Sequence, residues 1–478
     1  MKYIIILMLC ITLSSCNSWL DIEPNTKVTT GTAWATENAA KANVTGMYHR
    51  MRTAFSQGFI YWGEYRNGLW GPGRVIGSHE PFSTSYTSTM NSSNEMSNWS
   101  GIYTTINQAN LVVAHLPDVT FVNETEKNEA LAGAYFVRAF CYYWIARIWG
   151  DAPIELIPYE SIGSNQYASR EPATAVFAQV EADLALAREL MPSTARSTSA
   201  ASYAAVEMLA GDYFLWKYKL LNGTASDLAT ASDAIANVLA SHHDLEDIYA
   251  NIFRNEDSNR ETIFKWPYIK DEYENGYPFD YLYNPTNIDP VLHENPVPIF
   301  TSRQQWVNIT VDYAEYLYAI PSDTRAAVSY GYVENNISKG WVNKFPGSMI
   351  ESARVLDSDI GVYRFADAVL FDAEIKLVQQ NVSGARTALN RIAKRAYGVD
   401  NYYGGLTSED EVKDAIVAER KKEFVAEGRL WWDFIRLGVI FDECVWLQGR
   451  ENDRNVLLWP VHNSSINSNP NIKQTEGY

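Results

Sequence analysis

The sequence predicts an all-α protein whose helices pair with their neighbours along the chain, with long irregular segments between the pairs. Apolar residues recur at helical spacing in many separate segments. Of the 478 residues, 46% are hydrophobic and 20% are charged, which suits a large globular core and excludes a disordered chain. These patterns predict helices at residues 34–48, 96–116, 131–149, 173–190, 203–221, 366–378 and 384–397.

The helix expected at residues 131–149 has the clearest signal. It is apolar on nearly every face, which is typical of a helix that packs on two sides. Gly150 and Pro153 are expected to end it. Because Arg138 and Arg147 interrupt this most apolar later segment, we do not expect it to cross a membrane.

The later helices are expected to form antiparallel pairs. Val206, Ala210 and Tyr213 mark an apolar stripe along residues 203–221. In the last pair, Ser383 is the expected N-cap of the second helix. Successive pairs of about 35 to 45 residues resemble tetratricopeptide units, although that consensus is too degenerate to be identified from sequence alone.

Two long segments, residues 55–95 and 251–350, lack helical period yet are rich in aromatic side chains. Long irregular segments in a compact domain are usually functional loops or disordered linkers, and the aromatic content disfavours disorder. The side chains of interest are Tyr61, Trp62, Tyr65, Trp70, Arg74 and His79 in the first segment, and Trp266, Tyr268, Tyr273, Tyr277, Tyr281, Tyr283 and Trp306 in the second.

The N-terminus has the features of an export signal. Lys2 precedes an apolar run that is too short to span a bilayer, and small residues follow it. We therefore expect residues 1–15 to be a lipoprotein signal peptide and Cys16 to carry the lipid that anchors the mature chain. The alternative is a plain secretory signal in which Cys16 falls at this place by chance.

Charge and cysteine content exclude some classes of function. A net charge of −18 argues against nucleic acid as a partner, because nucleic acid requires a cationic surface. Beyond the signal and Cys16, the remaining cysteines are Cys141 and Cys444, for which a disulfide is the less favoured reading. Their spacing does not resemble a zinc site.

The last hundred residues carry a recognisable pattern. The segment IVAERKKEFVAEGRLWWDFIRLG at 416–438 and the ending LLWPVHNSSINSNPNIKQTEGY at 457–478 resemble signature segments of the SusD-like (RagB) family of outer-membrane nutrient-binding lipoproteins of Bacteroidetes. The ending departs from the family in KQTEGY, where Gln-Asn-x-Gly-Tyr is common. Further matches are YFVRAFCYYWIARIWGDAPI at 135–154, YRFADAVLFDAEIKL at 363–377 and ALNRIAKRAYG at 388–398.

The resemblance implies a tetratricopeptide-containing SusD-like fold and a binding function without chemistry. It implies an N-terminal helical region at residues 16–221 and a C-terminal SusD/RagB region at 222–478, packed on the helical scaffold. It also implies a cell-surface lipoprotein of the outer membrane that captures oligosaccharides and delivers them to a SusC-like TonB-dependent transporter. Capture of peptides, as in RagB-like importers, and hydrolysis of glycans at the surface are the alternatives.

The signature segment itself is expected to be structural. On a single helix, Glu419, Glu423 and Glu427 would share one face, and Asp433 would lie within reach of Arg429 and Arg436. A catalytic pair of carboxylates normally converges from separate elements, so acid–base chemistry is disfavoured here. At least one of two adjacent tryptophans, Trp431 and Trp432, is expected in the core.

Motifs for catalysis, cofactors or metals are weak or missing. The chain has no Gly-x-Ser-x-Gly elbow, His-Glu-x-x-His pair or Walker loop, and the glycines of GPGRVIG at 71–77 have the wrong spacing for a phosphate loop. His242 and His243 lack a third ligand, and a calcium loop starting at Asn255 lacks its glycine and its closing glutamate. We therefore expect no cofactor, no metal and no enzymatic activity.

A sugar binds flat on aromatic rings while polar side chains at the rim bond its hydroxyl groups. Both irregular segments supply these residue types, and the preferred candidates sit beside Gly, Pro and polar residues. The residues expected to contact the ligand are Trp70 and Arg74 from the first segment and Trp266, Tyr277 and Trp306 from the second.

Overall fold

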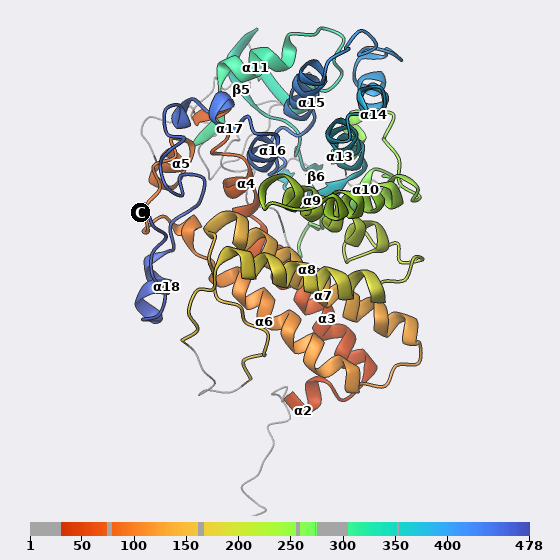
Figure 1. Ribbon diagram of the computed structural model, residues 1–478, viewed down its shortest axis with the longest axis vertical. Coiled ribbons are helices and arrows are strands. Elements are labelled where there is room, and N and C mark those ends of the chain that lie inside the picture. The colour runs from red at the N-terminus through yellow and green to blue at the C-terminus, as the bar shows by residue number, and fades with distance from the viewer. Residues whose placement is uncertain are drawn as a thin grey trace, which may run out of the picture.

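The computed structural model of the protein describes residues 30–73, 79–160, 167–254, 259–272, 274, 305–333, 335–350 and 353–478 (Figure 1). The longer helices are α3 (Glu37–Phe55), α6 (Ser100–His115), α7 (Glu124–Trp149), α8 (Ala173–Leu190), α9 (Tyr203–Leu220), α10 (Ala225–Leu239), α13 (Phe365–Val378), α14 (Val382–Tyr397) and α15 (Glu409–Glu423). The short helices are α2 (Thr30–Ala33), α4 (Gly58–Gly63), α5 (Glu80–Tyr86), α11 (Val311–Tyr318), α12 (Ala326–Ser329), α16 (Leu430–Leu437), α17 (Ile440–Glu443) and α18 (Asn463–Ser468).

The strands are short and pair in twos. They are β1 (Trp70–Pro72), β2 (Thr262–Trp266), β3 (Val307–Ile309), β4 (Tyr330–Val333), β5 (Asn336–Val342), β6 (Ser348–Ile350), β7 (Ala353–Val355) and β8 (Ile360–Arg364). Within the described ranges the antiparallel pairs are β1 with β3, β2 with β8, β4 with β5, and β6 with β7. Helices therefore form the body of the fold, as expected, and the strands form short two-stranded pairs, of which β2 and β8 are largely buried.

Neighbouring helices pack in pairs, as the sequence pattern predicts. In the lower half of Figure 1, α6 packs on both α3 and α7, and α8 packs on α7. The α9–α10 pair crosses the middle, and α13 packs on α10 and on α14 above it. Because α9 also contacts α13, helices from both sides of the expected boundary at residue 221 share one hydrophobic core, and that boundary stays a prediction.

The expected helices are confirmed, with shifts at their ends. The helix expected at 131–149 already starts at Glu124, because the Asn123 side chain accepts from the Thr125 N–H and caps a polar first turn that has no apolar signal. Helix α14 starts at Val382, and its N-cap is Asn381 instead of Ser383. Helix α10 was missed, although Thr224 and Asp227 form a capping box at its start.

We expected no regular structure at residues 55–95 and 251–350, and this prediction is wrong. The first segment contains α4, β1 and α5, and the second contains α11, α12 and strands β2 to β6. Every residue of α4 is buried, so this helix has no polar face and no amphipathic period. Strands β3 and β6 have three residues each, which is too short for an alternating pattern, and the longer β2 is buried along most of its length.

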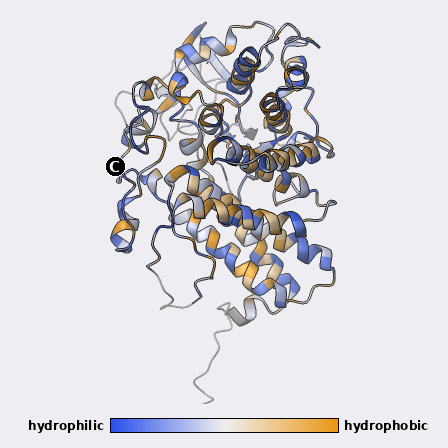
Figure 2. Cartoon of the chain, viewed as in Figure 1, coloured by the Kyte–Doolittle hydropathy of each residue, from blue (hydrophilic) through white to orange (hydrophobic). Residues whose placement is uncertain are grey.

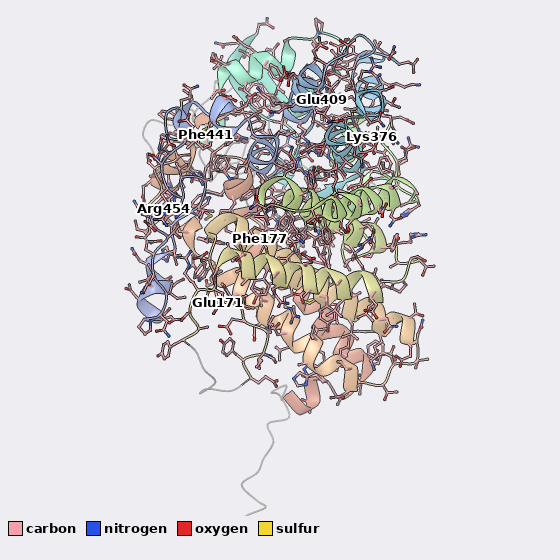
Figure 3. All side chains as sticks on the ribbon, in the orientation of Figure 1. Glu171, Phe177, Lys376, Glu409, Phe441 and Arg454 are labelled. Carbon is pink, nitrogen blue, oxygen red and sulfur yellow. The ribbon has the colours of Figure 1, made fainter. Side chains whose placement is uncertain are left out.

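Aromatic side chains fill the spaces between the helix layers. Phe177 on α8, labelled in Figure 3, lies near Tyr143 of α7 and Tyr213 of α9, with ring centroids 6.4 and 6.5 Å away. Figure 2 shows hydrophobic residues recurring along the stacked helices. Most of the aromatic residues thus contribute to packing, which the unusual aromatic content alone did not reveal.

The described part of the chain has no helix long and apolar enough to cross a membrane. Cys141 and Cys444 are both buried and free. Cys16 and the signal peptide lie outside the described residues, and their roles stay predictions.

Candidate ligand-binding site

Two strands bring the two aromatic-rich segments together. Strand β1 pairs with β3, with Trp70 opposite Ile309 and Pro72 opposite Val307. The pairing continues one residue further, where the Gly73 N–H donates to the Trp306 carbonyl at 3.0 Å. We call residues 70–73 and 305–309 the loop stem. The described parts of both segments therefore meet at one place, although they are far apart in the sequence.

The loop stem is fixed by close packing and by buried amides. A Cβ atom at Gly73 would lie 1.9 Å from the Gln305 carbonyl oxygen, so only glycine allows this approach. On the second strand, the side-chain amides of Gln305 and Asn308 both donate to the Gly340 carbonyl of β5 at 3.0 Å. These bonds hold β3 against β5 and make the stem a rigid base.

An aromatic pair crosses the loop stem. The ring centroids of His79 and Trp306 are 5.0 Å apart, with 57° between the ring planes. His79 is exposed and Trp306 is half-buried. This pair joins the two segments through their side chains and presents aromatic surface to solvent, as a sugar-stacking site requires.

Trp70 and Trp266, two of the predicted ligand contacts, belong to the core. Trp70 is 1% exposed and its ring packs edge-on against Tyr65, with centroids 4.9 Å apart. Trp266 is 2% exposed and lies between Phe55 and Phe59. Neither ring offers a face to a ligand in this structure. We expected loops at these positions because polar residues flank both tryptophans. In the structure both lie on short strands, and their side chains face the core.

The other predicted contacts have different positions. Arg74 and Tyr277 lie outside the described residues, and their contact with a ligand stays a prediction. Trp306 lies on the loop stem and is partly accessible. His79 was noted within the first segment but was not chosen as a contact. The sequence signal that could have identified His79 is its position just before Glu80 and Pro81, which start helix α5.

The signature segment at 416–438 is not the single helix that we had expected. Helix α15 ends at Glu423 and α16 starts at Leu430, because Ala426 and Gly428 take positive φ values of 59° and 71° between them. A Cβ at Gly428 would lie 2.5 Å from the Phe59 ring of α4, so glycine is needed there. The turn therefore packs directly on α4.

Glu64, at the end of α4, ties this turn to the segment that leads into β1. Its carboxylate accepts from the backbone N–H of Arg429 at 3.2 Å and from the Asn67 side chain at 2.9 Å. Burial raises the pKa of Glu64 to about 8. The buried hydrogen bonds of Glu64 thus connect the signature turn to the segment that leads into the loop stem.

The signature carboxylates serve packing. Glu419, Glu423 and Glu427 are at most 3% exposed. Burial opposes the ionisation of these carboxyl groups. Nevertheless, Arg395 and Arg364 hold the pKa of Glu423 well below its ordinary value. The pKa of Glu427 is lowered by Arg364 and Lys344. A carboxylate held ionised among buried cations is a poor general acid or base near neutral pH. The expected single face is wrong for Glu427, which lies in the turn.

Of the two ion pairs expected for Asp433, the one with Arg436 is confirmed and the one with Arg429 is wrong. Arg436 binds Asp433 at 2.8 Å, as spacing predicts, and Arg420 binds it from α15 at 3.0 Å. Arg429 instead binds Asp367 of α13 at 2.5 Å, because the helix break turns it away from Asp433. Both Trp431 and Trp432 are buried, which confirms the core position expected for at least one of them.

No cluster of three or more His, Cys, Asp or Glu side chains suited to a metal occurs in the part of the chain that the structure describes. His243 is buried beside His242, and its ring nitrogen lies 3.2 Å from the Arg260 carbonyl. Asn255, at the start of the calcium-like loop, is outside the described residues, whereas Asn259 donates to the Ile252 carbonyl.

A stacked helical scaffold with a rigid stem that bears the exposed His79 ring and the half-buried Trp306 ring suits a binding protein. Family models agree with this class along nearly the whole chain: one described as "Starch-binding associating with outer membrane" matches residues 18–211, and that of the SusD family matches residues 194–478. The chain belongs to the SusD family. This family comprises carbohydrate-binding, non-catalytic proteins associated with the outer membrane.

Individual relatives and solved structures agree. SusD-like protein P38 of Formosa agariphila is 22% identical, over 98% of this chain and 96% of its own. The starch-binding protein SusD of Bacteroides thetaiotaomicron is 30% identical over 29% of this chain and 25% of its own. The structure of NanU from B. fragilis has a TM-score of 0.79 and 26% identity, and the match covers 96% of this chain and 100% of that chain. The expected SusD-like fold is therefore confirmed.

Proposed function

We propose that this protein is a lipid-anchored surface protein that captures oligosaccharides at the loop stem and delivers them to a SusC-like TonB-dependent transporter of the outer membrane. Membership of a glycan-binding family supports the ligand class. The observation that supports this site is the His79–Trp306 pair, which joins the two aromatic-rich segments beside the rigid loop stem. Arg74 and Tyr277 are proposed to complete the site from the adjoining chain.

Replacing Trp306 by alanine is expected to weaken glycan binding on the order of tenfold, because one stacking ring contributes about 0.5–1.5 kcal/mol beyond its buried area. Affinity electrophoresis against a glycan panel measures the loss, and thermal melting checks the fold. Trp34 provides a matched control, since it too lies beside a histidine, His115, with ring centroids 5.3 Å apart. Trp34→Ala is expected to leave binding unchanged.

The same panel tests the alternatives. Retention of glycans without product supports capture, whereas release of shortened products would make the protein a glycoside hydrolase. Retention of peptides with no retention of any glycan would favour a peptide-capturing protein. A Trp306→Ala variant that melts and binds like the wild type would move the site away from the loop stem.

Replacing Cys16 by alanine is expected to release the protein from the outer membrane. The lipid on this cysteine is the proposed anchor, and stable attachment requires such acyl chains when no segment spans the bilayer. Fractionation of cells into membrane and soluble material measures the effect. Wild-type membrane retention of this variant would overturn the lipoprotein assignment. Co-extraction of the wild type with a larger outer-membrane protein in mild detergent tests the proposed transporter partner.

A further inference from the structure

A second cleft lies away from the loop stem and shares no residue with it. It has a volume of about 520 Å³, within the usual range for small-molecule sites. Helix α6, the segment 153–159 and α18 near the C-terminus form its walls, and these elements occupy the lower left of Figure 1. The side chains that matter are Tyr103, Asn107, Glu155, Tyr159 and Ser468.

The two tyrosines are held so that their rings face the cleft. The Tyr103 hydroxyl donates to the Pro153 carbonyl at 2.7 Å, and the Tyr159 hydroxyl donates to the Glu155 carboxylate at 2.5 Å. The Tyr159 N–H is also bound, by the Asn107 side-chain oxygen at 2.7 Å. Both tyrosines line the cleft, and because their hydroxyl groups are bound to the protein, the two rings are held in place there.

Hydrogen-bonding groups remain at the rim. Among the described residues, the side-chain nitrogen of Asn107 and the second carboxylate oxygen of Glu155 have no hydrogen-bond partner, and both side chains are half-buried. An amide donor and a carboxylate acceptor beside aromatic rings match the hydroxyl groups and the apolar face of a sugar.

The segment that carries Glu155 and Tyr159 is also fixed at its start. Ala152 and Glu171, the latter labelled in Figure 3, exchange two backbone hydrogen bonds of 3.0 Å and so close the segment that carries Glu155 and Tyr159. Arg170 donates to backbone carbonyls of Asp151 and Trp149. This arginine is thus engaged in structure, and Glu155 is the charged side chain among the residues that line the cleft. A neutral ligand suits that charge better than an anionic one.

We propose that this cleft is a second binding site for neutral oligosaccharides, separate from the loop stem. Its floor is the pair of tyrosine rings, and Asn107 and Glu155 bond the sugar hydroxyls. The inference goes beyond the proposed capture function and does not depend on where the first glycan binds. Two sites on one chain would let the protein hold a long glycan at two points and raise its avidity.

Binding of neutral trisaccharides tests the proposal. Maltotriose, cellotriose, mannotriose and xylotriose are titrated into the purified protein by calorimetry, with trigalacturonic acid as the anionic comparison. Tyr159→Ala removes a stacking ring, and Ser468→Trp fills the cleft from α18 without touching the tyrosines. Each is expected to weaken one neutral probe by about tenfold, and the anion is expected not to compete.

Tyr402→Ala is the matched control, because this tyrosine is 41% exposed on another part of the surface. Comparison with Trp306→Ala separates this proposal from the proposed function. Loss in the cleft variants alone supports the second site even if the loop stem fails. Loss in Trp306→Ala alone, wild-type affinity in both cleft variants, or no binding of any neutral probe at millimolar concentration overturns the second site.

Discussion

Replacing Arg364 by alanine is expected to destabilise the protein by about 3–5 kcal/mol, enough to remove much of the stability of an ordinary domain. The Arg364 side chain is 1% exposed. It binds Glu261 and Glu423 at 2.6 Å each and Glu427 at 2.8 Å. Removing the guanidinium leaves three buried carboxylates with less compensation, and that desolvation cost dominates the loss.

Denaturant unfolding measures this effect, and Arg454 provides the control. Arg454, labelled in Figure 3, pairs with Glu476 at the surface, where the two side chains are 70% and 62% exposed. Arg454→Ala is expected to cost less than about 1 kcal/mol, because exposed ion pairs contribute little. Equal losses in the two variants would show that burial does not set the strength of the Arg364 network.

The same network predicts the direction of the pH dependence. The pKa values of Glu423 and Glu427 are lowered in the folded protein, chiefly by Arg395 for Glu423 and by Arg364 for Glu427 once the opposing effect of burial is overcome. Their contribution to stability is therefore present above the ordinary glutamate pKa of about 4.5 and is lost as the pH falls through the lowered values. Acid, not base, is expected to weaken this part of the fold.

The sequence predicted the helical body well because its signals are local. The stripe along α9 and the all-apolar α7 follow from helical period, and α8 has the predicted ends. Elements fixed by distant contacts were missed. The break between α15 and α16 exists because Gly428 must pack on Phe59, a contact across the whole chain that no local pattern reveals.

The candidate site was predicted only in part, for a similar reason. Aromatic content in segments without period indicated the two segments that meet at the loop stem, but it could not separate rings that face inward from rings that face solvent. Trp70 and Trp266 pack on residues of other elements, whereas Trp306 remains partly accessible. The cleft beside Tyr159 was not predicted, since its walls come from three separate parts of the chain.

Replacing Trp431 by alanine is expected to cost about 3–5 kcal/mol of stability while leaving glycan affinity nearly unchanged. The Trp431 ring is fully buried, and the Arg66 guanidinium lies 4.3 Å from its centroid. Arg66 donates to three successive carbonyls, those of Val456, Leu457 and Leu458, and so holds the C-terminal segment. Truncation would remove the ring that covers this cation and leave a cavity under α16.

Chemical denaturation and glycan affinity, measured on the same preparations, separate a structural role from a binding role for Trp431. Trp446 is the matched control, because this tryptophan is 46% exposed and its truncation is expected to change stability by less than about 1 kcal/mol. Trp431→Phe is expected to recover part of the loss, since a smaller ring still covers Arg66. A Trp431→Ala protein of wild-type stability that no longer binds glycan would instead place α16 in the binding site and contradict the structural role of the signature segment.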